Sequence, residues 1–268
     1  THSLTGAFVG SGLVAVGFEF GFRVLATGFI LPLLISPVLA AALAAMGYPL
    51  LSRIIRRAGL TNENCLCVAG TSVPAAVTSN GMTMTESLTG LRLIMDQKAV
   101  CSETTAATVV AISAERLLDI GHYLSAGAVG FARGLNDTPK LIALGLVGSV
   151  ADLSWFIILV AVIMALGGLL NAKNVAETVS KRITAMQRDQ GFWANLVTSF
   201  LVIFASKWGM PVSTTHVSCG ALFGIGIANG QARWEVIRTI LLAWLLTLPL
   251  AAISAALIYA VLSRVAVL

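Results

Sequence analysis

Charged residues are scarce in this sequence: Asp, Glu, Lys and Arg together make up 11% of its 268 residues. A soluble domain carries about a quarter charged residues, because its surface faces water. Hydrophobic residues make up 57% of the chain, and the long apolar segments lack the polar faces that helices of a soluble core need. The composition therefore excludes a soluble domain and predicts an integral membrane protein in contact with the lipid bilayer.

Cysteine and histidine are also few, with four and three residues respectively. Cys65 and Cys67 have only the distant Cys101 as a further thiol ligand and no His beside them, so they do not form a convincing metal site. The cysteines do not have the spacing of a disulfide framework either, and the sequence contains no recognisable pairing of a nucleophile with a base. We therefore predict no enzyme, no catalytic residue, no bound metal and no cofactor.

The basic residues gather at the ends of apolar segments, and the net charge is +5. This distribution follows the positive-inside rule, so it predicts cytoplasmic loops and not a nucleic-acid-binding surface. A transmembrane helix needs roughly 20 apolar residues. The segments that meet or approach this length are 25–50, 155–170 with its flanks, 192–207 and 237–262.

A ten-residue pattern occurs twice, at residues 1–10 and 215–224. The two copies share Thr-His, Gly-Ala and the last Gly, and most other positions are small or apolar. Internal repeats of this kind indicate a repeated structural unit. Pro211-Val212-Ser213-Thr214 precedes the second copy and nothing precedes the first, so we expect that the chain begins inside the first copy.

The second copy follows a helix break. Segments 192–207 and 212–227 are short for a full crossing and are joined at Gly209-Met210-Pro211. Polar, broken backbone is tolerated at membrane depth only where it lines a cavity, so we predict a re-entrant helical hairpin. With the basic cluster 53–57 in the cytoplasm, the first copy opens toward the outside and the second toward the inside, as in secondary transporters with inverted repeats.

These observations predict an all-α polytopic membrane protein with inverted repeats, re-entrant hairpins and broken helices. Residues 1–57 form the end of the first inverted repeat, 58–117 a cytoplasmic insertion and 118–268 the second inverted repeat. Within the insertion we expect short strands at 65–68 and 72–77, a turn at Asn80-Gly81 and a helix at 85–98.

The first candidate site is a polar cluster in the middle of an apolar span. Asn136 and Asp137 lie between Gly134 and Pro139, and Lys140 follows Pro139 directly. Charged residues within a membrane helix indicate a functional site by default. A proline also leaves the carbonyl four residues earlier without its helical partner. We predict an unwound turn here that offers a carboxylate, an amide and free carbonyls to a small cation.

The second candidate site is the start of the helix after the break. Ser213, Thr214 and Thr215 follow Pro211, and Ser or Thr at such a position caps a helix. A helix N-terminus presents free N–H donors and positive potential, which suits phosphate or sulfate. His216 is an additional candidate, and the alternative role for its side chain is a hydrogen bond to the backbone.

The combination of Gly-x-Asn-Asp-x-x-Lys at 134–140 with Pro-Val-Ser-Thr-Thr-His at 211–216 resembles the inorganic phosphate transporter (PiT) family. The resemblance covers nearly the whole chain except the insertion. It also includes Ile35-Ser36-Pro37, Lys181-Arg182-Ile183 and Ala243-Trp244. That family is built from two inverted repeats, each with an Asn-Asp element and a Ser-Thr-Thr element, so by this pattern the chain would hold about half of the binding site.

The resemblance implies roles for individual residues. Thr1, Ser213, Thr214 and Thr215 would line the phosphate site, and Asn136 would take part in binding phosphate or the coupling cation. Asp137 would couple to that cation, and Lys140 and His216 are further candidates. The coupling ion, Na⁺ or H⁺, is left open, and it is the only co-transported species expected.

We therefore predict cation-coupled symport of inorganic phosphate by alternating access, in a multi-pass protein of the plasma or inner membrane. A carboxylate beside an anion requires a cation, a proton on the carboxylate or a proton on the anion. The last case favours phosphate over sulfate, which carries no proton. The alternatives are a sulfate permease, a passive channel and a non-transporting membrane receptor, and a homodimer is left open.

Overall fold

The computed structural model describes residues 1–19, 21–57, 64–72, 88–97, 108–147, 152–177 and 187–265. Contacts divide the chain into two compact units, one of Thr1–Tyr48 with Ser125–Leu268 and one of Pro49–Leu124. The first unit contains both predicted site motifs. The domain boundaries predicted at 57/58 and 117/118 stay a prediction.

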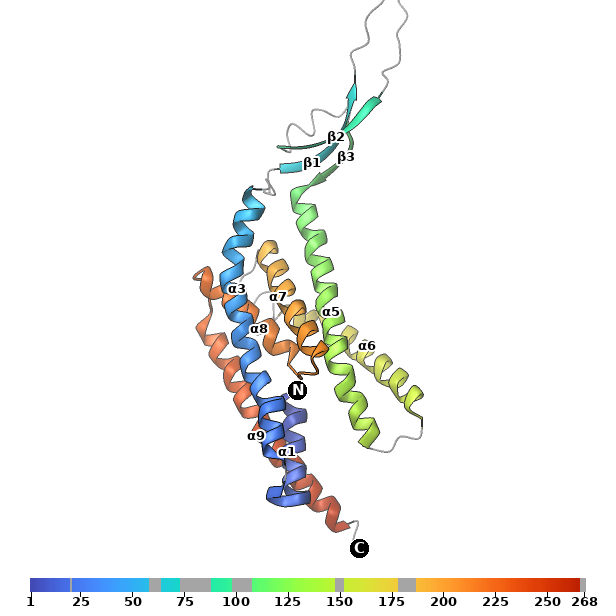
Figure 1. The fold of residues 1–268 in the computed structure, drawn as a ribbon, viewed down its shortest axis with the longest axis vertical. Helices are drawn as coiled ribbons and strands as arrows, with labels where there is room; N and C mark the ends of the chain where they lie inside the picture. The colour runs from blue at the N-terminus through green and yellow to red at the C-terminus, as the bar shows by residue number, and fades with distance from the viewer. Residues whose placement is uncertain are drawn as a thin grey trace, which may run out of the picture. The chain divides into compact units, whose positions relative to one another are not determined.

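The helices of the described chain account for each apolar segment that the sequence predicts (Figure 1). They are α1 (His2–Val16), α2 (Phe22–Leu25), the π-helical segment η2 (Ala26–Ile30), α3 (Leu31–Arg57), α5 (Ala114–Val147), α6 (Leu153–Glu177), α7 (Arg188–Lys207), α8 (Thr214–Ala228) and α9 (Trp234–Val265). A short 3₁₀ turn, η1 (Gly17–Glu19), follows α1. Within the described residues, three helical segments are long and apolar enough to cross a membrane: Phe22–Arg57, which joins α2, η2 and α3, Leu153–Leu170 and Trp234–Val265. The prediction of a polytopic helical membrane protein is confirmed.

The break between α7 and α8 forms a helical hairpin. α7 ends at Lys207 and α8 begins at Thr214, and Gly209 in the connection has a φ of 65°, which favours glycine. The two helices contact each other along the hairpin. With 15 residues, α8 is about 22 Å long, shorter than the roughly 30 Å of a bilayer's hydrocarbon core. Its length fits the predicted re-entrant arm.

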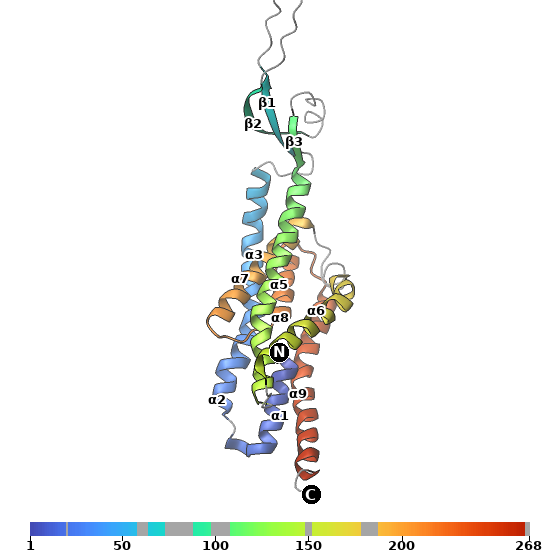
Figure 2. The same cartoon turned by 90° about the vertical axis from the view of Figure 1, so that its right-hand side faces the viewer.

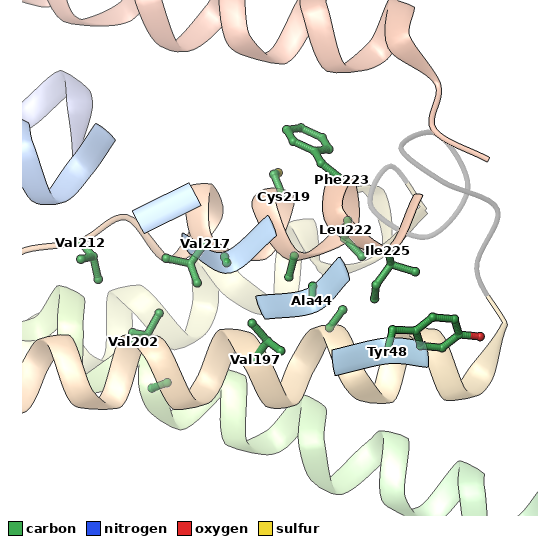
Figure 3. Close-up of a cluster of buried hydrophobic side chains, with 14 of the residues drawn as sticks. Ala44, Tyr48, Val197, Val202, Val212, Val217, Cys219, Leu222, Phe223 and Ile225 are labelled. Carbon is green, nitrogen blue, oxygen red and sulfur yellow. The ribbon is translucent and has the colours of Figure 1, made fainter. Parts of the chain in front are cut away.

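The main buried cluster lies where α3, α7 and α8 pack together (Figure 3). α8 is buried almost all round, as expected for a helix without a polar face. α9, in contrast, exposes most of its large apolar side chains, which suits a helix that faces lipid. Side chains of the cluster include Ala44, Tyr48, Val197, Val202, Val212, Val217, Cys219, Leu222, Phe223 and Ile225.

Two glycines let α8 lie directly on the backbone of α3. A Cβ at Gly220 would overlap the carbonyl oxygen of Pro37, and one at Gly224 would overlap that of Ala41. Small residues four apart allow close helix crossings of this kind. Because both contacts advance in the same direction along the chain, α8 runs parallel to α3.

The first copy of the repeat makes the equivalent contact with another helix. A Cβ at Gly6 would overlap the carbonyl oxygen of Leu248, and one at Gly10 would overlap that of Ala252, both on α9. Gly6 and Gly10 occupy the same positions in the first copy that Gly220 and Gly224 occupy in the second. α1 and α9 lie side by side in both views (Figure 1, Figure 2). Each copy therefore packs on the long helix that follows the other copy.

We expect Gly224→Ala to destabilise the protein, because the added methyl group meets backbone that cannot rotate away. Overpacking of this kind costs about 1–3 kcal/mol, which corresponds to a decrease in Tm of roughly 3–10 °C. Thermal unfolding of the purified protein in detergent measures the effect. Gly168→Ala on α6, where no atom lies within 4 Å of the new methyl group, is the matched control. Equal Tm values for the two variants would contradict the close α8–α3 contact.

The second unit contains a three-stranded antiparallel sheet in the order β2-β1-β3. β1 (Asn64–Ser72) is central and pairs with β2 (Leu88–Gln97) and β3 (Thr108–Ser113). The strand predicted at 65–68 is confirmed. The helix predicted at 85–98 is wrong, because residues 88–97 form β2 and pair with β1. The pairing of the two strands overrides the weak helical propensity of these residues. The strand predicted beyond Ser72, the Asn80-Gly81 turn and residues 181–183 lie outside the described residues.

Candidate functional site

The residues predicted from the two motifs lie together. The middle of α5 contacts the start of α8 through Asn136, and it contacts Thr1, just before α1, through Lys140. In Figure 1 the N-terminus lies beside the turn between α7 and α8. The site therefore combines segments that are far apart in the sequence.

The unwound turn predicted around Asp137 is not present. α5 is continuous from Ala114 to Val147, with Pro139 inside it. The proline still removes one backbone donor, so the carbonyl of Leu135 has no helical N–H partner. The prediction was wrong because one proline removes only one backbone hydrogen bond. The remaining backbone hydrogen bonds of α5, together with its side-chain contacts to neighbouring segments, keep the helix continuous.

Lys140 connects three segments of the chain. Its Nζ donates to Oδ1 of Asp137 at 3.1 Å, to the carbonyl oxygen of Val212 at 2.8 Å and to Oγ1 of Thr1 at 3.4 Å. Its side chain is only 13% exposed. All three donors of the ammonium group are thereby used, so Lys140 holds α5 against the starts of α1 and α8.

Asn136 is also committed to protein contacts. Its Nδ2 donates to Oδ1 of Asp137 at 2.9 Å and to the carbonyl oxygen of Val212 at 2.8 Å, and the residue is 4% exposed. The two hydrogens of the amide are both occupied. The Oδ1 atom of Asn136 is therefore the atom of this side chain that can contact a ligand. As a hydrogen-bond acceptor, it suits a cation better than an anion.

Arg133 is not among the residues predicted from the sequence, yet it contacts both motifs. Its Nε donates to Oγ1 of Thr214 and its Nη2 to Oγ1 of Thr215, each at 3.2 Å. The same Nε lies 3.9 Å from Oδ2 of Asp137, four residues along α5. The signal in the sequence was an arginine one helical turn before an aspartate within the same apolar span.

The start of α8 has the geometry of a capped helix N-terminus. Ser213 is the N-cap, and its side chain accepts a hydrogen bond from the backbone N–H of His216 at 3.4 Å, as predicted. Thr214 is buried, whereas Thr215 is exposed. The first turn of a helix leaves N–H groups without intrahelical partners and carries positive potential.

The two Thr-His copies meet at their histidines. The rings of His2 and His216 have centroids 4.3 Å apart, and His216 stacks on Trp244 of α9 at 3.7 Å. His216 is 4% exposed, and its Nδ1 has no hydrogen-bond partner in the described part of the chain. These contacts place His216 in the packing between α1, α8 and α9, and a direct contact between His216 and substrate stays a prediction.

Charge at the site is unbalanced toward positive. Arg133 and Lys140 flank the single carboxylate of Asp137, and the N-terminus of α8 adds further positive potential. A cavity of about 280 Å³ borders Thr1, Asp137 and Lys140. An excess of positive charge, hydroxyl groups and a helix N-terminus can hold a small oxyanion.

A family profile described as the phosphate transporter family matches residues 1–255. A protein of Thermococcus kodakarensis named "Putative phosphate permease" is 28% identical over 98% of this chain and 72% of its own length. A protein of Haemophilus influenzae with the same name is 36% identical over 56% of this chain and 39% of its own length. A solved structure titled "The sodium-dependent phosphate transporter" is similar over 98% of this chain, with 19% identity and a TM-score of 0.49. The chain spans 64% of that solved chain.

Proposed function

The chain belongs to the phosphate transporter family, and on that premise we propose that it carries inorganic phosphate across a membrane together with a cation. Membership of a transporter family also confirms the prediction that the chain is not an enzyme, and its apolar helices make it an integral membrane protein. The plasma or inner membrane as its location, and a homodimer as its assembly, stay predictions.

The observation that carries this proposal is the contact between the cations of α5 and the hydroxyl groups at the start of α8. Arg133 reaches Thr214 and Thr215, and Lys140 reaches Val212, two residues before α8. Positive charge, hydroxyl donors and a helix N-terminus thus converge on one point. Phosphate, with its several acceptor oxygens, matches this combination.

The sequence predicts that a carboxylate at Asp137 needs a cation or a proton beside an anion, and two resident cations lie beside it. Lys140 bonds its Oδ1 and Arg133 approaches its Oδ2. Two resident cations thus already offset the repulsion between this carboxylate and phosphate. Coupling at Asp137 stays a prediction, and a transported cation would share the carboxylate with Lys140 and use the carbonyl oxygen of Asn136 as a second ligand.

The arrangement of the two repeat copies supports alternating access. α1 runs parallel to α9 and α8 runs parallel to α3, and the two copies begin beside each other and point in opposite directions (Figure 1). Half-helices that meet end to end near the middle of the membrane are typical of transporters with inverted repeats. We propose that the two long helices and their partner half-helices rock against each other around this meeting point.

Asp137 also supports phosphate over sulfate as the substrate. Within the described residues, its Oδ2 has only the 3.9 Å contact with Arg133, whereas its Oδ1 accepts two hydrogen bonds. The hydroxyl group of HPO₄²⁻ can donate a hydrogen bond to this oxygen, whereas sulfate has no hydrogen to donate. The side chain of Asp137 is 30% exposed, and an acceptor of the site that is left unpaired disfavours an analogue that lacks the donor. A sulfate permease remains the second candidate, because the start of α8 alone does not distinguish tetrahedral oxyanions.

Uptake of labelled phosphate into liposomes that carry the protein in its natural full length tests this function. We expect uptake to require an inward gradient of Na⁺ or H⁺ and to be unaffected by excess unlabelled sulfate. Separate gradients of the two ions identify the coupling ion, and liposomes without protein are the control. Inhibition by sulfate would favour the sulfate permease, and uptake that ignores both gradients would contradict symport.

A further inference from the structure

We propose that Arg133 is a further substrate-binding residue, which sets the hydroxyl groups of Thr214 and Thr215 as donors and supplies positive charge to the oxyanion. This inference deepens the proposed function and rests on it. Its basis is the pair of hydrogen bonds from one guanidinium to two neighbouring hydroxyl oxygens at the start of α8.

The hydrogen bonds from Arg133 determine what the two threonines can offer to a ligand. A hydroxyl group has one hydrogen to donate and two lone pairs to accept. Because Thr214 and Thr215 each accept from the guanidinium, their own hydrogens point elsewhere and remain available. Two hydroxyl groups held as donors next to a helix N-terminus are suited to an anion and unsuited to a metal cation.

Arg133 also decides the sign of the charge at the site. Lys140 is already paired with Asp137 at 3.1 Å, so these two residues together are neutral. Arg133 adds a positive charge beyond this neutral pair, and half of its side chain (53%) is exposed. In the described part of the chain, the guanidinium N–H groups other than those bonded to the two threonines have no hydrogen-bond acceptor. Arginine presents its donors in a planar fork that matches oxyanions.

A purely structural role for Arg133 makes a different prediction. The connection between α5 and the start of α8 is already made by Asn136 and Lys140, which both bond the carbonyl oxygen of Val212. Loss of the exposed guanidinium should therefore leave the fold intact. Its loss should instead weaken binding of the anion, which raises the KM for uptake.

The test compares Arg133→Gln, Arg133→Lys and the wild type in the liposome uptake assay, with thermal unfolding of each protein. We expect Arg133→Gln to raise the KM for phosphate roughly 10- to 100-fold, the range for loss of a charged hydrogen bond, with an unchanged Tm. Arg133→Lys restores the charge without the fork and should give an intermediate KM. Arg23→Gln, an exposed arginine on α2, is the matched control and should match the wild type.

The outcomes separate this inference from the proposed function. If the wild type carries phosphate and Arg133→Gln has the same KM, the role of Arg133 is wrong and the function stands. If the wild type carries neither phosphate nor sulfate under any gradient, the function itself is wrong. If Arg133→Gln does not fold, the KM of Arg133→Lys decides, and a value equal to the wild type would overturn the proposed role.

Discussion

Replacing Lys140 with Met is expected to reduce phosphate uptake by at least about 100-fold and to destabilise the protein, because the partly buried carboxylate of Asp137 then loses its nearest cation. The ammonium group of Lys140 bonds Asp137, Val212 and Thr1. Breaking a buried ion pair by removing one partner costs about 3–5 kcal/mol. Asp137 would keep only Arg133, 3.9 Å away. Uptake into liposomes and thermal unfolding in detergent measure the two effects.

A double variant separates the stability effect from the transport effect. Asp137→Asn combined with Lys140→Met removes both charges, and replacing both members of a buried pair is often nearly neutral for stability. We expect the double variant to recover most of the lost Tm and to remain inactive. Lys207→Met, at the exposed end of α7, is the control for loss of a lysine. Full transport by the Lys140→Met variant would remove Lys140 from the site.

Replacing Asp137 with Asn is expected to abolish cation-driven uptake while preserving the shape of the side chain. The amide cannot carry the negative charge that a transported Na⁺ or H⁺ needs. Its Oδ1 can still accept from Lys140 and Asn136, but its Nδ2 would replace Oδ2 beside Arg133 and could not accept from a ligand. We expect uptake to decrease by at least about 100-fold, because intramembrane carboxylates of this kind serve ion pathways. Any residual uptake should no longer respond to the gradient.

The measurement is phosphate uptake by the Asp137→Asn protein with and without the gradient of the coupling ion. Glu235→Gln, in the exposed first turn of α9, is the matched control for replacing a carboxylate with an amide. It should keep both the rate and the dependence on the cation. Full transport that still depends on the cation would show that coupling occurs at another residue.

The elements of this membrane unit could be predicted from the sequence because a bilayer imposes a strong requirement on each of them. A crossing helix must be long and apolar, so α3, α6 and α9 are visible as apolar runs. The hairpin of α7 and α8 is visible as a break with glycine and proline between two short runs. The sheet was less predictable, because β2 has no local preference strong enough to identify it without its partner β1.

The site could be predicted only in part. Asn136, Asp137 and Lys140 stood out because polar groups are costly in an apolar span, and the start of α8 stood out through its capping residues. Arg133 has the same cost, but nothing in the sequence says that its guanidinium reaches Thr214 and Thr215, 81 and 82 residues away. The continuity of α5 through Pro139 was also unpredictable, because it depends on contacts with other segments.

The sequence by itself determined the class of protein, the positions of its long apolar helices and the repeated Thr-His unit. Each of these follows from composition or local pattern. The thickness of the bilayer sets the length of an apolar helix, and the spacing of apolar residues indicates the type of secondary structure. The tertiary structure alone decided which copy packs on which long helix and which charges neutralise one another. Those outcomes depend on distances between residues that are remote in the chain, such as Gly224 on Ala41 and Lys140 at Val212.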